Sequence, residues 1–188
     1  MASPRAYLDL TLREWLDELA RADGAAGGGA ALGFAVASGA AVLAMAARVS
    51  GSGGLVAQAD VLRARTASLA QENADSYDAA LTVRSTSEGL KPEQRDWKIG
   101  RAFAQAAELP LQIARAGADV AELAAQLAAS GDPRVRADAL AAAALGAAAA
   151  RGAVALVAVN LTALEGDPRV AEVEQLAAAA ERSATRVH

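Results

Sequence analysis

The chain has 188 residues, a length typical of one domain with a substantial core, and we expect a single helical domain over residues 1–188. Its formal net charge of −4 argues against nucleic acid as the main partner, because phosphate binding requires a basic surface. The sequence contains no cysteine, which excludes disulfides and thiolate chemistry, and its only histidine is the last residue, His188. Acid–base chemistry is therefore left to carboxylates, lysines and tyrosines, and we predict no metal site.

The composition favours an all-α fold. Alanine dominates the sequence, aromatic residues make up only 3%, and the Val, Ile and Tyr runs typical of strands are missing. We predict an up-and-down bundle of five to seven helices with long Ala-rich central helices. Asp9 precedes any long apolar run, so no signal peptide is evident, and we expect a cytoplasmic protein.

The first predicted helix begins at a capping box. Thr11 is the expected N-cap, and Glu14 follows three residues later, where its carboxylate can reach back to the cap. Apolar residues then recur at helical spacing along one predicted face, namely Leu12, Trp15, Leu16 and Leu19. This pattern predicts a short amphipathic helix that ends before Gly24.

Three consecutive glycines, Gly27, Gly28 and Gly29, open the segment on which the other predicted helices pack. Glycine permits positive φ angles and close approach by a ligand or another backbone. The following residues up to Ala47 are helix formers without charge, so the glycines should lie at a helix N-terminus, whose free N–H groups favour anions or carbonyl oxygens.

The same segment is long enough to span a membrane, since about 20 apolar residues suffice. However, it consists largely of Ala and Gly and has no Trp or Tyr at either end. Small residues at Gly29 and Gly33 also suit close helix packing in a soluble bundle. We therefore favour a buried helix over a membrane span, and we predict no membrane association.

A long helix is predicted from Leu55 to about Arg84, with an apolar stripe formed by Leu55, Leu62, Leu69 and Tyr77. Asn73 falls close to Leu69 on this stripe, whereas Asp75 and Asp78 lie toward the opposite side. Asn73 is therefore the polar residue expected to point inward, and the two aspartates are expected to be solvated.

Prolines mark the next boundaries. Pro92 suits the first position of a helix, and Pro110 predicts a kink or break. The pentapeptide Gly-Asp-Pro-Arg-Val occurs at residues 131–135 and again at 166–170. We interpret each copy as a helix start, with Asp as N-cap and Pro at the first helical position.

The segment between the two copies predicts an Ala-rich helix of about 30 residues, from Pro133 to Glu165. Asp138 and Leu156 have nearly the same helical angle, which predicts a buried aspartate that needs a partner. Asp138 and Asn160 are about 33 Å apart on a straight helix, so they share a site only across a dimer.

The sequence resembles the cyclodeaminase/cyclohydrolase family, which comprises formimidoyltetrahydrofolate cyclodeaminase domains and methenyltetrahydrofolate cyclohydrolases. The resemblance covers nearly the whole chain. The matching positions are Leu12, Trp15, Leu16 and Leu19 in the opening helix, Gly27 to Gly29 in the glycine signature, Val42 to Met45, Glu72 to Tyr77, Pro110, Asp138 and Asn160-Leu161.

Several polar positions depart from the family pattern. Gly24 and Ala26 replace two prolines, Ala30 and Ala137 replace serines, Asn73 replaces an aspartate, Asp132 replaces an asparagine and Leu156 replaces another asparagine. An asparagine cannot act as a carboxylate base, so the scaffold is retained better than the polar site.

The resemblance implies a homodimer, which the surplus of small apolar residues also favours, and a tetrahydrofolate derivative as substrate with no covalently bound cofactor. Such enzymes either close a formimino group to the methenyl bridge with loss of ammonia or hydrolyse that bridge to 10-formyltetrahydrofolate. The implied catalytic residues are Asp138 and Asn73. The implied substrate-binding residues are Gly27, Gly28, Gly29, Tyr77 and Asn160.

Structural alternatives stand beside these roles. Asp138 also suits a structural hydrogen-bond acceptor or an interface residue, the glycines suit tight helix entry, and Tyr77 suits the core. The alternative function is a non-catalytic relative, a helical dimer that binds a folate-like ligand or a protein. Arg95, Lys98 and Arg101 suggest contacts with a glutamate tail, although we favour a solvated helix face as the simpler explanation.

Overall fold

The structure, a computed structural model, describes residues 6–23 and 26–186, so Gly24 and His188 lie outside the described residues. In the described part, the chain forms helices and no strand, which confirms the predicted all-α class. The α-helices are α1 (Leu12–Leu19), α2 (Gly28–Val49), α3 (Gly53–Thr86), α4 (Pro92–Ala106), α5 (Glu108–Ser130), α6 (Arg136–Asn160) and α7 (Pro168–Thr185). Two short 3-10 helices, η1 (Tyr7–Asp9) and η2 (Pro133–Val135), precede α1 and α6.

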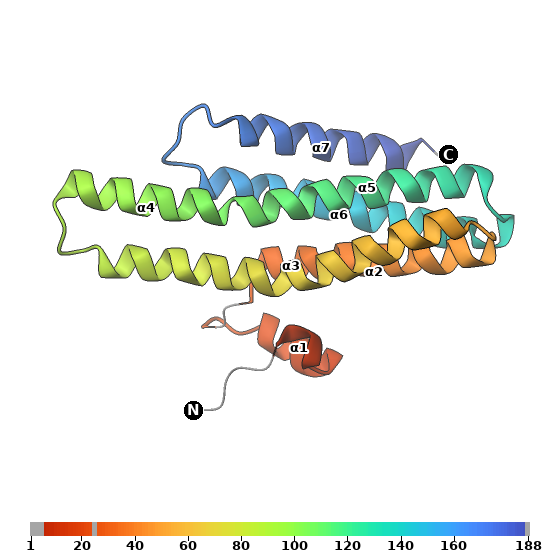
Figure 1. Ribbon diagram of the computed structural model, residues 1–188, viewed down its shortest axis with the longest axis horizontal. Coiled ribbons are helices and arrows are strands. Elements are labelled where there is room, and N and C mark those ends of the chain that lie inside the picture. The colour runs from red at the N-terminus through yellow and green to blue at the C-terminus, as the bar shows by residue number, and fades with distance from the viewer. Residues whose placement is uncertain (1–5, 24–25, 187–188) are drawn as a thin grey trace.

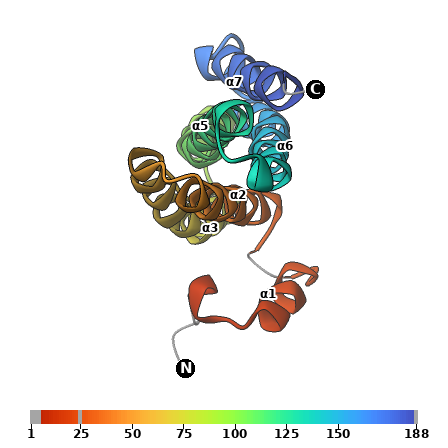
Figure 2. The same ribbon diagram turned by 90° about the vertical axis from the view of Figure 1, so that its right-hand side faces the viewer.

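The long helices form an up-and-down bundle in layers (Figures 1 and 2). Helices α2 and α3 form one antiparallel pair, and α5 and α6 form a second pair that packs on it. Helix α7 covers the outer side of the second pair, whereas α1 lies on the far side of the first (Figure 2). Helix α4 packs on the C-terminal half of α3 and extends the bundle at one end (Figure 1).

Glycines allow the two helices within each central pair to approach until their backbones are in contact. A methyl group added at Gly117 on α5 would lie 2.7 Å from the Gly146 carbonyl oxygen on α6, and one at Gly146 would lie 2.5 Å from the Gly117 oxygen. Between α2 and α3, a methyl group at Gly33 would lie 3.1 Å from the Ala70 backbone nitrogen. Helix axes this close leave little room for side chains, which explains the Ala-rich core.

Helix α1 begins at the predicted capping box. The Glu14 backbone N–H donates to Thr11 Oγ1 at 3.2 Å, and the Thr11 N–H donates to Glu14 Oε2 at 2.8 Å. Trp15 is buried against Tyr7 and Phe34, with ring centroids 4.9 and 4.7 Å apart. This aromatic cluster attaches the N-terminal segment to α2.

Helix α1 carries the predicted apolar face, but only part of this face is buried. Leu12 and Leu16 are 73% and 54% exposed, while Trp15 is buried. The short helix is amphipathic as predicted, but its position beside α2 covers only part of the apolar face.

Helix α2 is the central helix that the glycine-led segment predicted. Its N-cap is Gly27, and none of the three glycines has a positive φ; among described residues only Gly51 and Gly166 do. The residues Gly28–Val49 and 133–160 are long and apolar enough to cross a membrane by length and composition alone. In the most apolar 18-residue stretch of each segment, 56% of the residues in α2 and 39% of those in 133–160 are buried inside the bundle.

Both Gly-Asp-Pro-Arg-Val segments start helices, as predicted. Asp132 and Asp167 are the N-caps, and each carboxylate accepts a hydrogen bond from the backbone N–H two residues later. The first copy starts η2 before α6. Helix α6 ends at Asn160 rather than at Glu165, because residues 161–166 turn before α7 and Gly166 adopts a φ of 79°.

Pro110 coincides with a break in the helix, as predicted. Helix α4 ends at Ala106 and α5 starts at Glu108, so Pro110 lies in the first turn of α5, where a helix has no partner for an N–H group. The break is limited to Ala107, and α5 continues along the line of α4 (Figure 1).

We expect Gly146→Ala to lower the free energy of unfolding by about 1–3 kcal/mol, because the new methyl group would overlap the Gly117 backbone. Chemical denaturation measures this change. The control is Gly54→Ala, where a methyl group meets nothing within 4 Å. Equal stability of the two variants would contradict the close helix packing.

The Asp167 carboxylate should stabilise the fold at neutral pH. Hydrogen bonds from the Arg169 side chain and backbone lower the pKa of Asp167 from 3.8 to about 2. A lowered pKa gives stability that is present above about pH 4 and is lost as the pH falls toward 2. We expect Asp167→Asn to lower the melting temperature at pH 7, with a difference that shrinks toward pH 2. A difference independent of pH would contradict this assignment.

Candidate functional site

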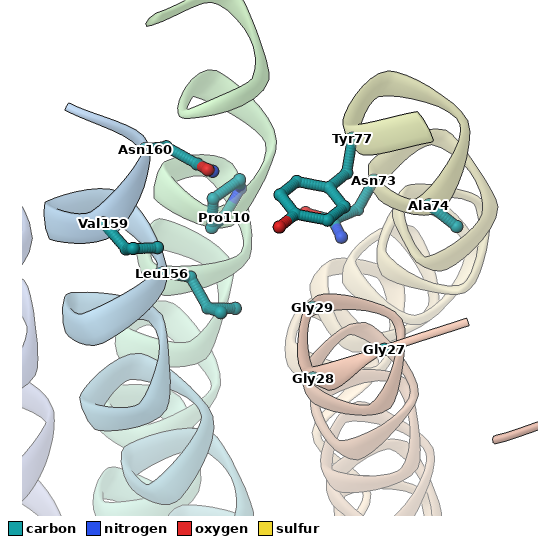
Figure 3. Close-up of a pocket in the computed structure, with 10 residues that line it drawn as sticks. All are labelled: Gly27, Gly28, Gly29, Asn73, Ala74, Tyr77, Pro110, Leu156, Val159 and Asn160. Carbon is teal, nitrogen blue, oxygen red and sulfur yellow. The ribbon is translucent and has the colours of Figure 1, made fainter. Parts of the chain in front are cut away.

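Most of the predicted site residues surround one cavity of about 210 Å³ at the level where α2 begins and α6 ends (Figure 3). Its walls come from four separate helices and the residue before α2. The lining residues are Gly27, Gly28, Gly29, Asn73, Ala74, Tyr77, Pro110, Leu156, Val159 and Asn160.

The glycines form the floor of this cavity at the start of α2. Gly27 is the N-cap and has no side chain to cap the helix, and the first helical bond runs from the Ala31 N–H to the Gly27 oxygen at 3.1 Å. The N–H groups of Gly28 and Gly29 therefore have no partner within the helix. They give this end of the cavity a partial positive charge.

Asn73 reaches the glycine turn from α3, as the apolar stripe predicted. Its side-chain amide lies directly against Gly29, so that a methyl group at Gly29 would overlap the amide atoms. Gly28 has more room, since a methyl group there would lie 3.9 Å from Leu156 Cδ2. Glycine at position 29 is therefore a steric requirement for the observed position of the Asn73 amide.

Tyr77 lies one turn beyond Asn73 and forms part of the cavity mouth. Its side chain extends from α3 toward Pro110 (Figure 3). The ring meets Phe103 edge-on with centroids 6.0 Å apart, and the residue is 42% exposed. The prediction that Tyr77 belongs to the core is wrong, because its side chain lines the open cavity and is not enclosed by neighbouring helices. Asp75 and Asp78 are exposed, as predicted.

Asn160 lies on the opposite wall, at the last residue of α6. Only 8% of this residue is exposed, and its Oδ1 atom is buried without a hydrogen-bond partner among the described residues. Its amide points into the space between α6 and α3 (Figure 3). A buried amide oxygen without a partner is rare in native proteins and indicates a place for a ligand or water.

The cavity wall carries no charged side chain in the part of the chain that the structure describes. Tyr77 is the only titratable residue among those that line it. The described residues also contain no group of three or more His, Cys, Asp or Glu side chains suited to a metal. The single-chain site thus offers amides, backbone N–H groups and apolar surface.

Asp138 does not belong to this cavity, and the expectation that it is buried is wrong for the single chain. It is exposed in the first turn of α6, at the opposite end from Asn160. The helical angle correctly groups it with Leu145 and Leu156, but both leucines are only partly buried. This face of α6 is incompletely covered within one chain, so its residues retain contact with solvent.

The basic residues of α4 also lie away from the cavity wall. Arg95 pairs with Asp96 at 3.0 Å, and the Arg101 guanidinium lies 5.4 Å from the centre of the Trp97 ring. Lys98 is exposed on the same helix. These contacts lie on the surface of α4 itself, in agreement with the solvated-face interpretation.

Four lining residues were not assigned a site role from the sequence, namely Ala74, Pro110, Leu156 and Val159. Leu156 is one helical turn before Asn160, so the spacing of four residues is the signal that places it on the same face. Ala74 and Val159 directly adjoin Asn73 and Asn160 in sequence and carry no signal of their own.

Comparisons with known proteins agree with the resemblance seen in the sequence. A crystal structure of formiminotetrahydrofolate cyclodeaminase from Thermotoga maritima superposes with a TM-score of 0.85 at 23% sequence identity. The match covers 96% of this chain and 94% of that one, and it establishes a common fold. A search of curated protein sequences found no significant match.

The family model described as formiminotransferase-cyclodeaminase matches residues 11–179, which include α1 to α6 and most of α7. The match therefore includes every residue that lines the cavity. The chain belongs to the formiminotransferase-cyclodeaminase family.

Proposed function

We propose that this protein is an enzyme of folate one-carbon metabolism, a methenyltetrahydrofolate cyclohydrolase or a formimidoyltetrahydrofolate cyclodeaminase. The observation that carries the proposal is the cavity in which the glycine turn, Asn73, Tyr77 and Asn160 meet in a chain of this family. In this role the glycine N–H groups and Asn160 bind the substrate, and Asn73 and Tyr77 orient it.

Both reactions require proton transfer at nitrogen next to an amidinium-like carbon. Asn73 cannot supply a proton at neutral pH, and no carboxylate lines the cavity in the described chain. In our proposal Asp138 of a second chain supplies this group within a homodimer. The incomplete cover of the Asp138 face of α6 supports this arrangement, as does the distance along the helix that keeps Asp138 out of its own cavity.

The uncharged cavity wall also favours a second candidate function, a relative that binds a folate-like ligand without turnover. In this case Asp138 stabilises the first turn of α6, where a negative charge interacts favourably with the helix dipole. Folate binding and homodimer formation are common to both candidates. We also propose that the protein works in the cytoplasm.

The first functional prediction concerns turnover and its dependence on Asp138. We expect the purified protein to remove methenyltetrahydrofolate, seen as a loss of its absorbance, and Asp138→Ala to slow this reaction about 10²–10⁴-fold through loss of acid–base catalysis. Asp78→Ala is the matched control, because Asp78 is an exposed helical aspartate that does not line the cavity.

Sedimentation of the same samples tests the dimer. A dimer with turnover that Asp138→Ala abolishes supports the cyclohydrolase proposal. For the cyclodeaminase, the corresponding signal is release of ammonia from formimidoyltetrahydrofolate. A folded protein that binds folate but turns over neither compound would favour the non-catalytic relative, and a monomer with full activity would exclude the shared site.

The second functional prediction concerns the contact between Gly29 and Asn73. We expect Gly29→Ala to raise KM or lower kcat at least tenfold, because the new methyl group would displace the Asn73 amide from its position. Gly27→Ala is the milder comparison, since a methyl group there meets nothing within 4 Å. Equal effects of the two substitutions would argue against a positioned Asn73 amide.

A further inference from the structure

One side of α6 is exposed and uncharged over most of its length. Helices α2, α5 and α7 pack against the other sides of α6 (Figure 2). From Ala141 to Val159 the only charged residue is Arg151, which faces α7 and pairs with Glu181 there at 3.0 Å. The open side, called the α6 stripe below, consists of Ala137, Ala141, Ala144, Ala148, Gly152, Ala155 and Val159, all of them exposed except the partly buried Gly152.

The apolar surface continues onto the neighbouring side of α2. Leu145 of α6 lies against Gly39 of α2, where a methyl group would lie 3.3 Å from Leu145 Cβ. Beside this contact, Ala35, Val42 and Val49 recur every seven residues along α2, and Val49 is 42% exposed. An exposed apolar surface that extends over two neighbouring helices indicates an interaction site.

The spacing of the α6 stripe is the same in both directions. From Ala137 to Val159 the steps are four, three, four, four, three and four residues, so the pattern is symmetric about Ala148. A twofold contact between identical helices uses such symmetry, because each residue before the centre meets the residue equally far beyond the centre on the other copy. An antiparallel partner centred at Ala148 would therefore bring small residues opposite one another, which lets the two helices approach closely.

This symmetry favours a second copy of the chain over other occupants. A lipid surface requires no symmetric spacing, and it favours large apolar side chains with Trp or Tyr at the membrane boundary, which the stripe does not contain. A charge near a twofold axis faces the same charge on the other copy, and like charges repel. The absence of charge around Ala148 on the stripe meets this requirement.

Such a pair would place Asp138 of one chain at the cavity of the other. In an antiparallel pair centred at Ala148, residue 138 lies level with residue 158 of the other copy, since both are ten residues from the centre. Asp138 and Leu156 have nearly the same helical angle, and the twofold axis keeps this side of both helices on one side of the interface. Leu156 lines the cavity. The Asp138 carboxylate is thus about 30 Å along the helix from its own cavity but beside that of the other copy.

The cavity end of α6 has the features of an incomplete site. Asn160 is only 8% exposed, and its Oδ1 atom has no hydrogen-bond partner among the described residues. Val159, the last residue of the stripe, is 63% exposed. No charged side chain lines the cavity in the described part of the chain. A second chain at this end would cover Val159 and add the missing carboxylate.

We infer that two copies of this chain pair through an antiparallel contact of their α6 stripes centred on Ala148, so that each cavity receives Asp138 from the other chain. The inference rests on the proposed homodimer and identifies its surface and its register. The outer side of α2 that carries Ala35, Val42 and Val49 then borders the same interface.

Introduced cysteines test this register without any turnover, because the chain has no cysteine of its own. Ala148→Cys lies next to its own copy at the twofold axis, so mild oxidation should convert most of the protein to a covalent dimer, seen by non-reducing electrophoresis. Ala141→Cys alone should not cross-link, since its copy is about 21 Å away along the helix, whereas Ala141→Cys combined with Ala155→Cys should. Ala178→Cys, at an exposed position of α7, is the matched control.

Mixed dimers test the contribution of Asp138 to the other chain's cavity. Gly29→Ala impairs the cavity and Asp138→Ala removes the carboxylate, so a dimer with one chain of each kind contains one intact site. Co-expression of the two variants in equal amounts should restore about a quarter of the wild-type activity, because half of the dimers are mixed and each has one intact site of two. Each variant alone should stay well below this level.

The outcomes separate this inference from the proposed function. If folded Ala148→Cys protein cross-links no faster than Ala178→Cys, the inference is overturned, whether the protein is a monomer, pairs through another face or binds membranes. Turnover by such a protein would leave the proposed enzyme standing. Cross-linking in the expected register supports the inferred pairing even if no folate is turned over. An active wild type with no recovery in the mixed dimers would overturn the assignment of Asp138 to the other chain's cavity.

Discussion

Close contact between helix backbones is the constraint on which this structure depends. On α5 and α6, Gly117 and Gly146 each lie against the backbone carbonyl oxygen of the other, and Gly33 of α2 lies against the backbone of Ala70 on α3. With axes this close, large side chains do not fit between the helices, and alanine fills most of the core. The short distance between α2 and α3 also places the Asn73 amide against Gly29, so the packing of the bundle fixes the geometry of the site.

The candidate site lies where helix ends meet inside an otherwise apolar bundle. Helix termini are the parts of such a bundle that offer unpaired backbone groups, and α2 begins and α6 ends at the same level. Asn160 adds a buried acceptor to the donors of α2. Charge is absent from the cavity wall among the described residues, so recognition would depend on the direction of hydrogen bonds, while proton transfer would require a group from elsewhere.

Local sequence signals predicted the helix boundaries well because they act within a few residues. The capping box at Thr11, the aspartate caps at Asp132 and Asp167, and the break near Pro110 all occur where the sequence placed them. Asn73 also faces inward as its helical angle predicted. The burial of Asp138 was predicted wrongly, since a helical angle says which face a residue lies on but not whether another helix covers that face.

The sequence by itself determined the fold class and the helices with most of their ends. It did so because helix propensity, capping and apolar periodicity are local properties of the chain. Only the tertiary structure decided that Gly29 and Asn73 touch, that the buried Asn160 oxygen has no hydrogen-bond partner among the described residues, and that Asp138 is exposed. Those relations depend on how α2, α3, α5 and α6 pack against one another, which no short segment of sequence encodes.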